Sequence, residues 1–238
     1  MNKREWGKLS NRFESSVCDI VAADSRDLLG HLLDQAGFVK CRGAAIDAGC
    51  GVGTFVGRHA ARFENVLAFD FVEGFVARAQ SRLGERYPHV LWLCDNIGEI
   101  SKHFQQDFDC VVSLNVLTHA NAWTRRAHWQ AVCSLARSGG TLLVVVPSTE
   151  SHERTHSIIV RRNLGRGDKV SGGIVRRSGT RQKTYTEAEL IGLTKHFGFA
   201  AHVVRRISYP WAYDGVQRAN PVTDHRPWDW VCWATKAY

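Results

Sequence analysis

Three glycines at alternate positions follow a short apolar run that contains an acid, in the stretch IDAGCGVGTF of residues 46–55. Glycine has no Cβ atom and adopts positive φ angles without steric cost. Gly49, Gly51 and Gly53 therefore permit a tight turn and a close approach of another molecule to the main chain. Asp47 adds an acidic group immediately before that turn. These residue types predict a binding site in which a ligand touches the backbone directly.

The spacing of the glycines separates two kinds of nucleotide site. A dinucleotide-binding fingerprint requires G-x-G-x-x-G, but Thr54 stands where its third glycine would be and Gly53 comes one residue early. A P-loop is excluded because no Gly-Lys-Ser/Thr follows. The pattern acid-x-G-x-G-x-G, here DAGCGVG, resembles the first motif of the class I S-adenosylmethionine-dependent methyltransferases.

Further stretches match that family in order along the chain. Asp70 ends the run VLAFD about 20 residues after the glycine turn, where a carboxylate can accept hydrogen bonds from both hydroxyls of a ribose. The run VLWLCDN resembles the third strand and VVSLNVLTHA the fourth-strand motif, and LARSGGTLLVVVPS resembles the helix, turn and fifth strand. The resemblance covers roughly residues 40–200. It implies S-adenosyl-L-methionine as cofactor, held by Asp47, Gly49, Cys50, Gly51, Gly53, Asp70, Phe71, Asp95, Asn96, Asn115 and Val116.

Within that set, the resemblance implies that different residues contact different parts of the methyl donor. Asp47 and the glycine turn would meet the methionine end of the donor, Asp70 the ribose, and Asp95 with Asn96 the adenine. Asn115 and Val116 would lie beside the cofactor. Because the sulfonium already activates the methyl group, the protein mainly has to hold a nucleophile in line with it.

A general base is needed when the nucleophile is a hydroxyl or a protonated amine. His119, at the start of the loop after the fourth strand, and Tyr185 are the candidate catalytic residues. The alternative for His119 is an ordinary polar loop residue. No set of Asp, Glu or His at metal spacing is present, so we expect no metal ion.

The methyl acceptor is narrowed by elimination. The fourth strand does not end in the Asn/Asp-Pro-Pro-Tyr pattern of amino methylases, and the Pro-Cys nucleophile of cytosine methylases and the paired-glutamate loop of arginine methylases are missing. A nitrogen or oxygen nucleophile of a small molecule remains. Tyr209, Trp211 and Tyr213 are the candidate substrate-binding residues, since aromatic side chains suit a pocket for a drug-sized molecule. The alternative is that they pack in a core of their own.

The segment 150–183 is rich in arginine and supports a rival hypothesis of an RNA or peptide substrate. The formal net charge of +8 raises the expectation of an anionic partner without identifying it. The segment offers no stacking platform beyond His152 and His156, so nucleic acid is not favoured. An anionic small substrate is also compatible with these arginines.

Short β-type runs alternate with helical patterns, which predicts βαβ units. We expect an α/β fold with a Rossmann-like, seven-stranded, mostly parallel sheet, helices on both faces and an antiparallel C-terminal strand. A single methyltransferase domain would span 1–238. Its expected parts are N-terminal helices forming a cap (1–38, with Trp6 and Phe13), a cofactor-binding core (40–148), a lid insertion (149–184), and a C-terminal helix with a strand pair (185–238).

The seven cysteines form no CxxC pair, and most lie in apolar runs, which indicates free thiols in a reducing compartment. Neither a signal peptide nor a long apolar span is visible, so the expectation is a cytoplasmic protein that makes no membrane contact. The sequence leaves the oligomeric state open.

Overall fold

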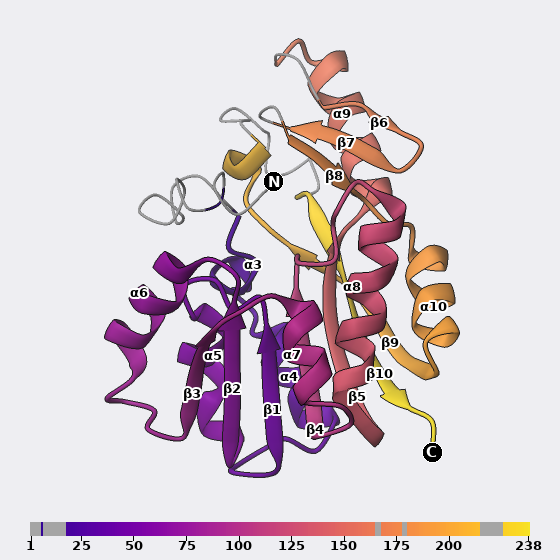
Figure 1. Cartoon of the computed structure of the whole chain (residues 1–238). Coiled ribbons are helices and arrows are strands. Elements are labelled where there is room, and N and C mark those ends of the chain that lie inside the picture. The colour runs from indigo at the N-terminus through magenta and orange to yellow at the C-terminus, as the bar shows by residue number, and fades with distance from the viewer. Residues whose placement is uncertain (1–5, 7–17, 165–167, 178–179, 215–225) are drawn as a thin grey trace.

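The fold is built on one mixed sheet. The computed structural model describes residues 6, 18–164, 168–177, 180–214 and 226–238. Within them, seven strands lie in the order β3-β2-β1-β4-β5-β10-β9 (Figure 1). The neighbours from β3 to β5 run parallel, whereas β10 is antiparallel to both β5 and β9, which confirms the predicted fold class. The strands are β1 (Ala44–Ala48), β2 (Asn65–Asp70), β3 (Val90–Cys94), β4 (Phe108–Leu114), β5 (Ala136–Pro147), β9 (Phe199–Ser208) and β10 (Trp228–Lys236).

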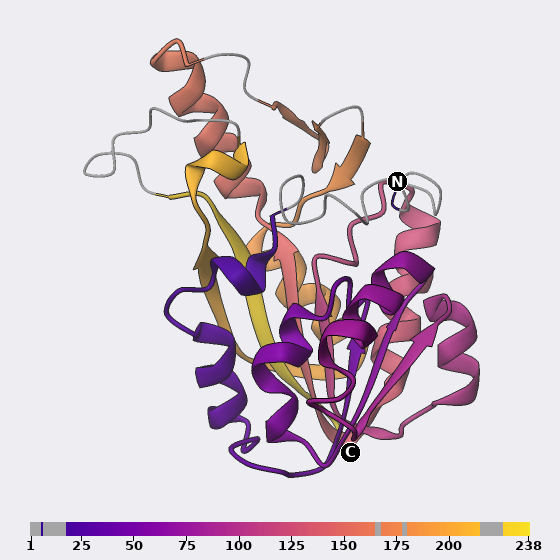
Figure 2. The ribbon, with the colours of Figure 1, turned by 90° about the vertical axis from the view of Figure 1, so that its left-hand side faces the viewer.

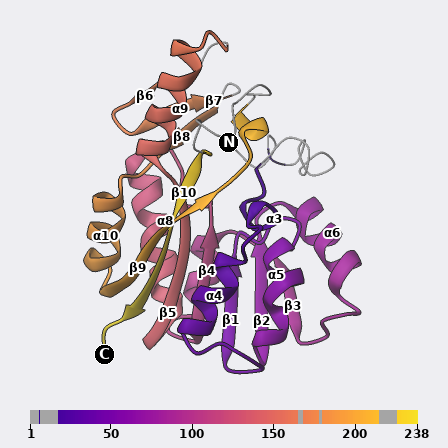
Figure 3. The same ribbon diagram turned by 180° about the vertical axis from the view of Figure 1, so that it is seen from behind.

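Helices cover both faces of this sheet, as the alternation of strands and helices predicts. The face seen from behind in Figure 3 carries four of them, whose apolar residues join one core with Ala45, Val112 and Val231. These are α3 (Ile20–Ala23), α4 (Leu28–Gln35), α5 (Thr54–His59) and α6 (Glu73–Leu83). The other face packs a second core around Ile46 and Val144. It carries α7 (Ile97–His103), α8 (Ala122–Leu135) and α10 (Glu187–His196).

The carboxyl ends of β1, β2, β4 and β5 meet at one edge of the sheet, and a further substructure stands above that edge (Figure 2). It comprises the helix α9 (Thr149–Arg161) and a small antiparallel sheet of β6 (Val170–Ser171), β7 (Ile174–Arg177) and β8 (Thr180–Lys183). The sequence showed no strong period here. The helix α9 begins because the Ser148 hydroxyl accepts a hydrogen bond from the Ser151 N–H, and Ile158 and Ile159 pack with Trp211.

Several element boundaries differ from the sequence-based expectation. In the stretch LARSGGTLLVVVPS, which resembles a helix, turn and strand, the helix α8 ends at Leu135 and β5 already begins at Ala136. The helix α7 was not predicted, although Asn96 caps it by accepting a hydrogen bond from the Glu99 N–H. The predicted C-terminal helix is α10, which begins with a capping box of Thr186 and Glu189.

The two C-terminal strands form the predicted antiparallel pair, but β10 lies inside the sheet and β9 forms its edge. At the other end of the chain, the Trp6 ring packs 6.2 Å from the Phe75 ring, centroid to centroid, over the helix α6. Phe13, the second aromatic residue expected in the N-terminal cap, lies outside the described residues.

Candidate functional site

The glycine turn lies between the end of β1 and the start of α5, docked on the end of β2. Gly49, Gly51 and Gly53 have φ angles of +83°, +53° and +76°, so all three use the left-handed region that glycine favours. The N–H groups of Gly49 and Cys50 both donate to the Phe69 carbonyl at 2.9 Å. The turn is thus shaped by main-chain bonds to the neighbouring strand.

Two of the three glycines are required by the protein's own packing. A Cβ atom on Gly49 would lie 2.4 Å from Cγ2 of Val116, and one on Gly53 would lie about 3.0 Å from side chains of Ala79 and Leu83. The prediction of a close backbone approach is therefore met at these two positions by Val116 and by the helix α6. No ligand is needed to explain either glycine.

Asp47 is the most unusual residue at this edge. Its side chain is buried, and its Oδ2 atom has no hydrogen-bond partner among the described residues. Burial raises the pKa of this carboxyl to about 8, with further contributions from the negative charges of Asp70 and Asp19. A buried carboxyl surrounded by other acids is ready to be stabilised by a cationic group.

Asp70 ends β2 directly beside the turn. One of its oxygens accepts a hydrogen bond from the Val72 N–H at 2.9 Å, and the other accepts from the Gly51 N–H at 3.1 Å. Burial raises its pKa to about 6, against the opposing effect of the hydrogen bonds from backbone N–H groups. A carboxylate has about four lone-pair sites, so acceptor capacity remains beside these backbone bonds.

The end of β3 joins the same site. The Asp95 N–H donates to the Asp70 carbonyl at 3.1 Å, which brings the two predicted residues side by side. Asp95 Oδ1 accepts from the Asn96 N–H at 2.7 Å. The Asn96 side chain caps α7, so its carbonyl oxygen is engaged within the protein. Phe71 is half-buried and packs against a small cluster that contains Val52 and Phe75.

Asn115 ends β4 in a left-handed conformation, with φ +58°. Its Nδ2 donates to Asp229 Oδ2 at 2.8 Å, while its buried Oδ1 has no partner among the described residues. Left-handed backbone in a residue other than glycine costs free energy and is held here by the surrounding strands. A second buried oxygen without a partner among the described residues thus lies at the same edge as that of Asp47.

Two residues at this edge were not predicted. Asp19 caps α3 and accepts a hydrogen bond from the Thr54 hydroxyl at 2.5 Å, which fixes an acid near Asp47. Asp229 is buried between Trp228 and Trp230 in β10 and holds Asn115. An acid inside an otherwise apolar strand is a visible signal, but its partner, 114 residues away, is known only from the fold.

Comparison with known proteins identifies the class of this site. Residues 45–140, which contain the glycine turn, Asp70 and Asn115, match the model of a methyltransferase domain family. Residues 45–140 thus form a class I S-adenosylmethionine-dependent methyltransferase domain. The chain is a methyltransferase with S-adenosylmethionine as methyl donor, as the order of its motifs predicted.

Solved structures of methyltransferases share the fold. The chain is similar to the Burkholderia thailandensis 1,6-didemethyltoxoflavin-N1-methyltransferase, solved with its acceptor and S-adenosylhomocysteine, at 18% identity, TM-score 0.63 and coverage of 100% of this chain and 92% of that one. The magnesium protoporphyrin IX methyltransferase of Synechocystis PCC 6803 with S-adenosylhomocysteine is 18% identical, with a TM-score of 0.65 and coverage of 92% of this chain and 84% of that one. The Bradyrhizobium japonicum WM9 N-methyltransferase NodS is 14% identical, with a TM-score of 0.65 and coverage of 100% of both chains. No protein with a curated description matches the sequence.

The two candidate catalytic residues of the methyltransferase differ in environment. His119 is exposed, its Nδ1 accepts from the Asn121 N–H at 3.1 Å, and its backbone forms a bridge with Gln182. Tyr185 is fully buried: its hydroxyl accepts from the Trp129 indole N–H at 3.1 Å and donates to the Leu117 carbonyl. Burial raises the pKa of Tyr185 to about 12. This geometry favours a structural role for Tyr185 over a chemical one.

The three candidate substrate-binding aromatics do not form one cluster. Tyr209 is buried in the core on the α3–α6 side of the sheet, and Trp211 is buried against Ile158 and Ile159 of α9. Tyr213 is half-buried at the margin of the first core. Tyr209 and Trp211 thus pack in two different clusters, and their role in substrate binding stays a prediction. Among the described residues, no helix has the length and apolar character needed to span a membrane.

Proposed function

We propose that this methyltransferase transfers a methyl group to a nitrogen or oxygen nucleophile of a small molecule. The observation that supports this proposal is the attachment of the substructure after β5 above the carboxyl edge of the main sheet. The Lys183 N–H donates to the Thr118 carbonyl at 2.8 Å, and Gln182 bridges to His119. These two contacts attach the small sheet to the loop after β4, so that it covers part of the carboxyl edge of the main sheet. A partly covered edge suits a small acceptor.

The comparisons support this substrate class without extending to the acceptor itself. The similar structures include an N1-methyltransferase of didemethyltoxoflavin, a magnesium protoporphyrin IX methyltransferase and an N-methyltransferase. Those names describe the activities of those proteins. For this chain, the shared fold and the partly covered carboxyl edge make a small nitrogen or oxygen acceptor the best-supported hypothesis.

The donor fits the polar groups of the turn. Asp47, buried with an unpartnered oxygen, suits the ammonium of an amino acid, and the spare acceptor capacity of Asp70 suits the two ribose hydroxyls. Asp95 lies one main-chain hydrogen bond from Asp70, in line with an adenine beyond the ribose. The remaining predicted cofactor residues surround these three or shape the turn.

When bound, the donor supplies an electrophilic methyl group. The protein's part is to align the acceptor, exclude water and receive a proton where the nucleophile carries one. Nδ1 of His119 accepts a hydrogen bond from the Asn121 N–H, so the neutral ring carries its proton on Nε2 and can donate a hydrogen bond from there. We therefore propose His119 for acceptor orientation through Nε2–H, with proton uptake at Nδ1 only after the Asn121 hydrogen bond is released, and retain Tyr185 as a structural support of the loop.

The direct test is methyl transfer from a labelled donor into a metabolite extract, separated by molecular size. Label in the small-molecule fraction supports the proposal. Asp70→Asn provides the background, because loss of that carboxylate should remove donor binding. Label confined to RNA or protein contradicts the small-molecule proposal and favours the arginine-rich segment 150–183, in which Arg161 and Arg176 are exposed.

A further inference from the structure

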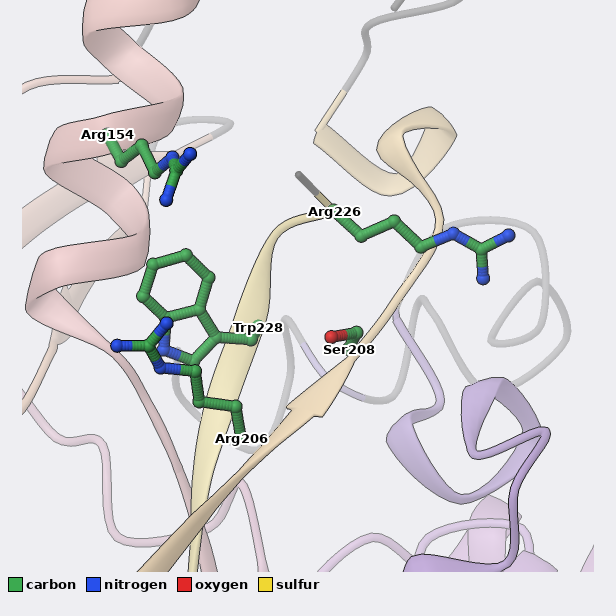
Figure 4. A pocket seen from close by; sticks show the side chains of 5 residues that line it. All are labelled: Arg154, Arg206, Ser208, Arg226 and Trp228. Atoms are coloured by element: carbon green, nitrogen blue, oxygen red, sulfur yellow. The ribbon is translucent and has the colours of Figure 1, made fainter. Parts of the chain in front are cut away.

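A small pocket lies between α9 and the ends of β9 and β10, at the same edge as the donor residues but outside that set. Its volume is about 250 Å³, and its lining residues are Arg154, Arg206, Ser208, Arg226 and Trp228 (Figure 4). Three of the five carry positive charge and none carries negative charge. A site that small suits one functional group of a ligand, since pockets for whole drug-sized molecules start at roughly 300 Å³.

The ladder between β9 and β10 explains why these side chains meet. Trp228 stands opposite Ser208 and Trp230 opposite Arg206, so the four side chains lie on one face of the sheet. The Arg206 guanidinium carbon lies 4.5 Å from the centroid of the Trp228 ring and 5.4 Å from that of Trp230. Stacking on an aromatic face holds a guanidinium while leaving its N–H edge able to bind a ligand.

Several hydrogen-bond donors at the pocket have no acceptor among the described residues. Trp228 is only 4% exposed, yet its indole N–H finds no partner among the described residues. Arg154 and Arg206 form no salt bridge or hydrogen bond with any residue that the structure describes. In Figure 4 their side chains lie on either side of the Trp228 indole, while Arg226 extends away past Ser208 at the rim. A buried donor left unpaired is costly, so the arrangement is incomplete without an acceptor.

The chemistry of these groups selects an anion. A carboxylate or phosphate supplies several acceptor oxygens and a negative charge, which both a guanidinium and an indole N–H can bind. One described acid of α9, Glu150, is already engaged: its Oε2 accepts from the Trp230 indole N–H at 3.0 Å, and its Oε1 accepts from the Glu187 N–H at 3.2 Å. It therefore does not supply the missing acceptor.

The position along the sheet indicates which part of a ligand the pocket holds. From β1, which bears the glycine turn, the order runs through β4 and β5 to β10. Three steps between strands amount to roughly 14 Å. A group bound at Trp228 is thus remote from the glycine turn and from Asp70, although Asp229, next to Trp228, contacts the predicted donor residue Asn115 at the end of β4. The pocket suits a distant part of an acceptor rather than the accepting atom.

We propose that Arg154, Arg206 and Trp228 bind a carboxylate or phosphate group of the methyl acceptor, with Arg226 at the rim. The proposal rests on the proposed small-molecule transfer and adds a substrate class to it: an acidic acceptor whose negative group lies far from the methylated atom. Binding at a remote group contributes equally before and during transfer, so it lowers KM more than it raises kcat.

Binding of two probes, inorganic phosphate and benzoate, tests the pocket directly. The readout is the NMR signal of the Trp228 indole N–H, assigned by its loss in Trp228→Phe. The wild type should show a saturable shift, and Arg206→Gln should weaken binding about tenfold, as expected for loss of one charge-assisted hydrogen bond. Arg205→Gln is the matched control: it removes the same charge from the adjacent residue, whose side chain faces the other side of β9. The ranking of the two probes distinguishes a phosphate from a carboxylate ligand.

Two results would overturn the proposal. One is the absence of a saturable shift with both probes, and the other is an equal weakening by Arg205→Gln, which would indicate unspecific attraction to positive charge. S-adenosylhomocysteine is titrated into the same samples by calorimetry. If it binds while neither probe does, the anion pocket fails and the donor site stands. If the probes bind and S-adenosylhomocysteine does not, the anion pocket stands and the donor site fails.

The substrate assignment has its own readout. Product labelled from the extract should be retained on an anion exchanger, and Arg154→Gln should raise KM for the purified acceptor about tenfold with kcat changed less than about twofold. A neutral or cationic labelled product would contradict the assignment. So would label in RNA that is lost in Arg154→Gln, because the pocket would then serve a nucleic acid.

Discussion

Along one edge of the sheet, β1 and β2 end in buried acids, whereas β9 and β10 meet among exposed arginines. Asp47 and Asp70 have raised pKa values because they are buried, and at Asp47 because further acids lie nearby. Arg154 and Arg206 flank an indole and find no acid to pair with among the described residues. The two regions are complementary in charge, which suits a positively charged donor at one end and a negative acceptor group at the other.

The two regions also differ in how the chain builds them. Every predicted donor residue from Asp47 to Asn96 lies at the end of one of three successive strands or within five residues after it, so each is placed by local sequence. The arginine pocket collects residues from α9, β9 and the start of β10. The comparison teaches that the donor region is a property of the motif order, and the pocket a property of strand pairing. The following changes test whether the two regions act independently.

The largest effect is expected at Asp70. Asp70→Asn removes the negative charge and the acceptor for the Gly51 N–H, so S-adenosylhomocysteine affinity should fall about 100-fold, or ~2.7 kcal/mol. Calorimetry measures this loss. Asp107→Asn, the same change before β4 at the opposite edge, should leave the affinity unchanged. Phosphate binding at Trp228 should be unaffected, and a parallel loss there would show that the two regions are not independent.

Gly49→Ala should be the next most damaging. An alanine there combines a φ of +83° with a Cβ atom 2.4 Å from Val116 Cγ2, so the free energy of unfolding should fall by about 2–3 kcal/mol. Denaturant titration measures it. Adding Val116→Ala should restore part of the loss, since it removes the clash but not the backbone strain.

Gly192→Ala is the control for Gly49→Ala. Gly192 lies within α10, and an added Cβ would meet nothing within 4 Å, so a gain of about 0.5–1 kcal/mol is expected. Equal effects of the two substitutions would show that the turn has no special packing requirement.

Tyr185→Phe distinguishes a structural from a catalytic tyrosine. It leaves the Trp129 indole N–H and the Leu117 carbonyl without their buried partner, which should lower the free energy of unfolding by about 1–3 kcal/mol. Methyl transfer below the melting temperature should stay within about twofold of wild type, because a remote structural change leaves the transition state intact. A loss of kcat with unchanged stability would instead return Tyr185 to the chemistry.

The smallest expected effect is a pH dependence of stability. Folding raises the pKa of Asp47 from 3.8 to about 8, so the folded state binds more protons between those values and loses stability as pH rises. The same applies to Asp70 up to about pH 6. His59, with its pKa lowered from 6.5 to about 4 by burial, has the opposite sign, but only below pH 6.5.

Between pH 6.5 and 8, Asp47 is therefore the main contributor of these three groups. The melting temperature of the ligand-free protein should fall over that interval, and Asp47→Asn should flatten the profile. A flat wild-type profile would contradict a raised pKa at Asp47. S-adenosylhomocysteine should bind more tightly as pH rises over the same interval, because its ammonium favours the ionised carboxylate.

The sequence allowed prediction of the sheet, the glycine turn and the donor acids because each signal is local: an apolar strand, then an acid or glycine at its end. It did not predict Asp19 or Asp229, whose importance comes from contacts with Thr54 and Asn115 in other elements. Gly49 and Gly53 were interpreted as ligand contacts, whereas Val116 and α6 occupy the space beside them. A glycine pattern cannot say which partner fills that space.

The aromatic residues show the same limit from the other side. Tyr209 and Trp211 were equally compatible with a pocket and a core, and the fold buries both. Trp228 was not among the candidate substrate-binding residues, and its stacking with Arg206 depends on the register of β9 and β10, which sequence composition does not specify. Side chains that act through strand pairing are the ones that a linear motif search misses.

The placement of β10 inside the sheet has a consequence for biosynthesis. Strands β5 and β9 each pair with β10, so both expose an unpaired edge until the nascent chain has extended through residue 236. The side-chain amide of Asn115 likewise cannot form its hydrogen bond to Asp229 until β10 has been synthesised. During translation the donor region can collapse early from local contacts, but an aggregation-prone intermediate persists until that single strand inserts.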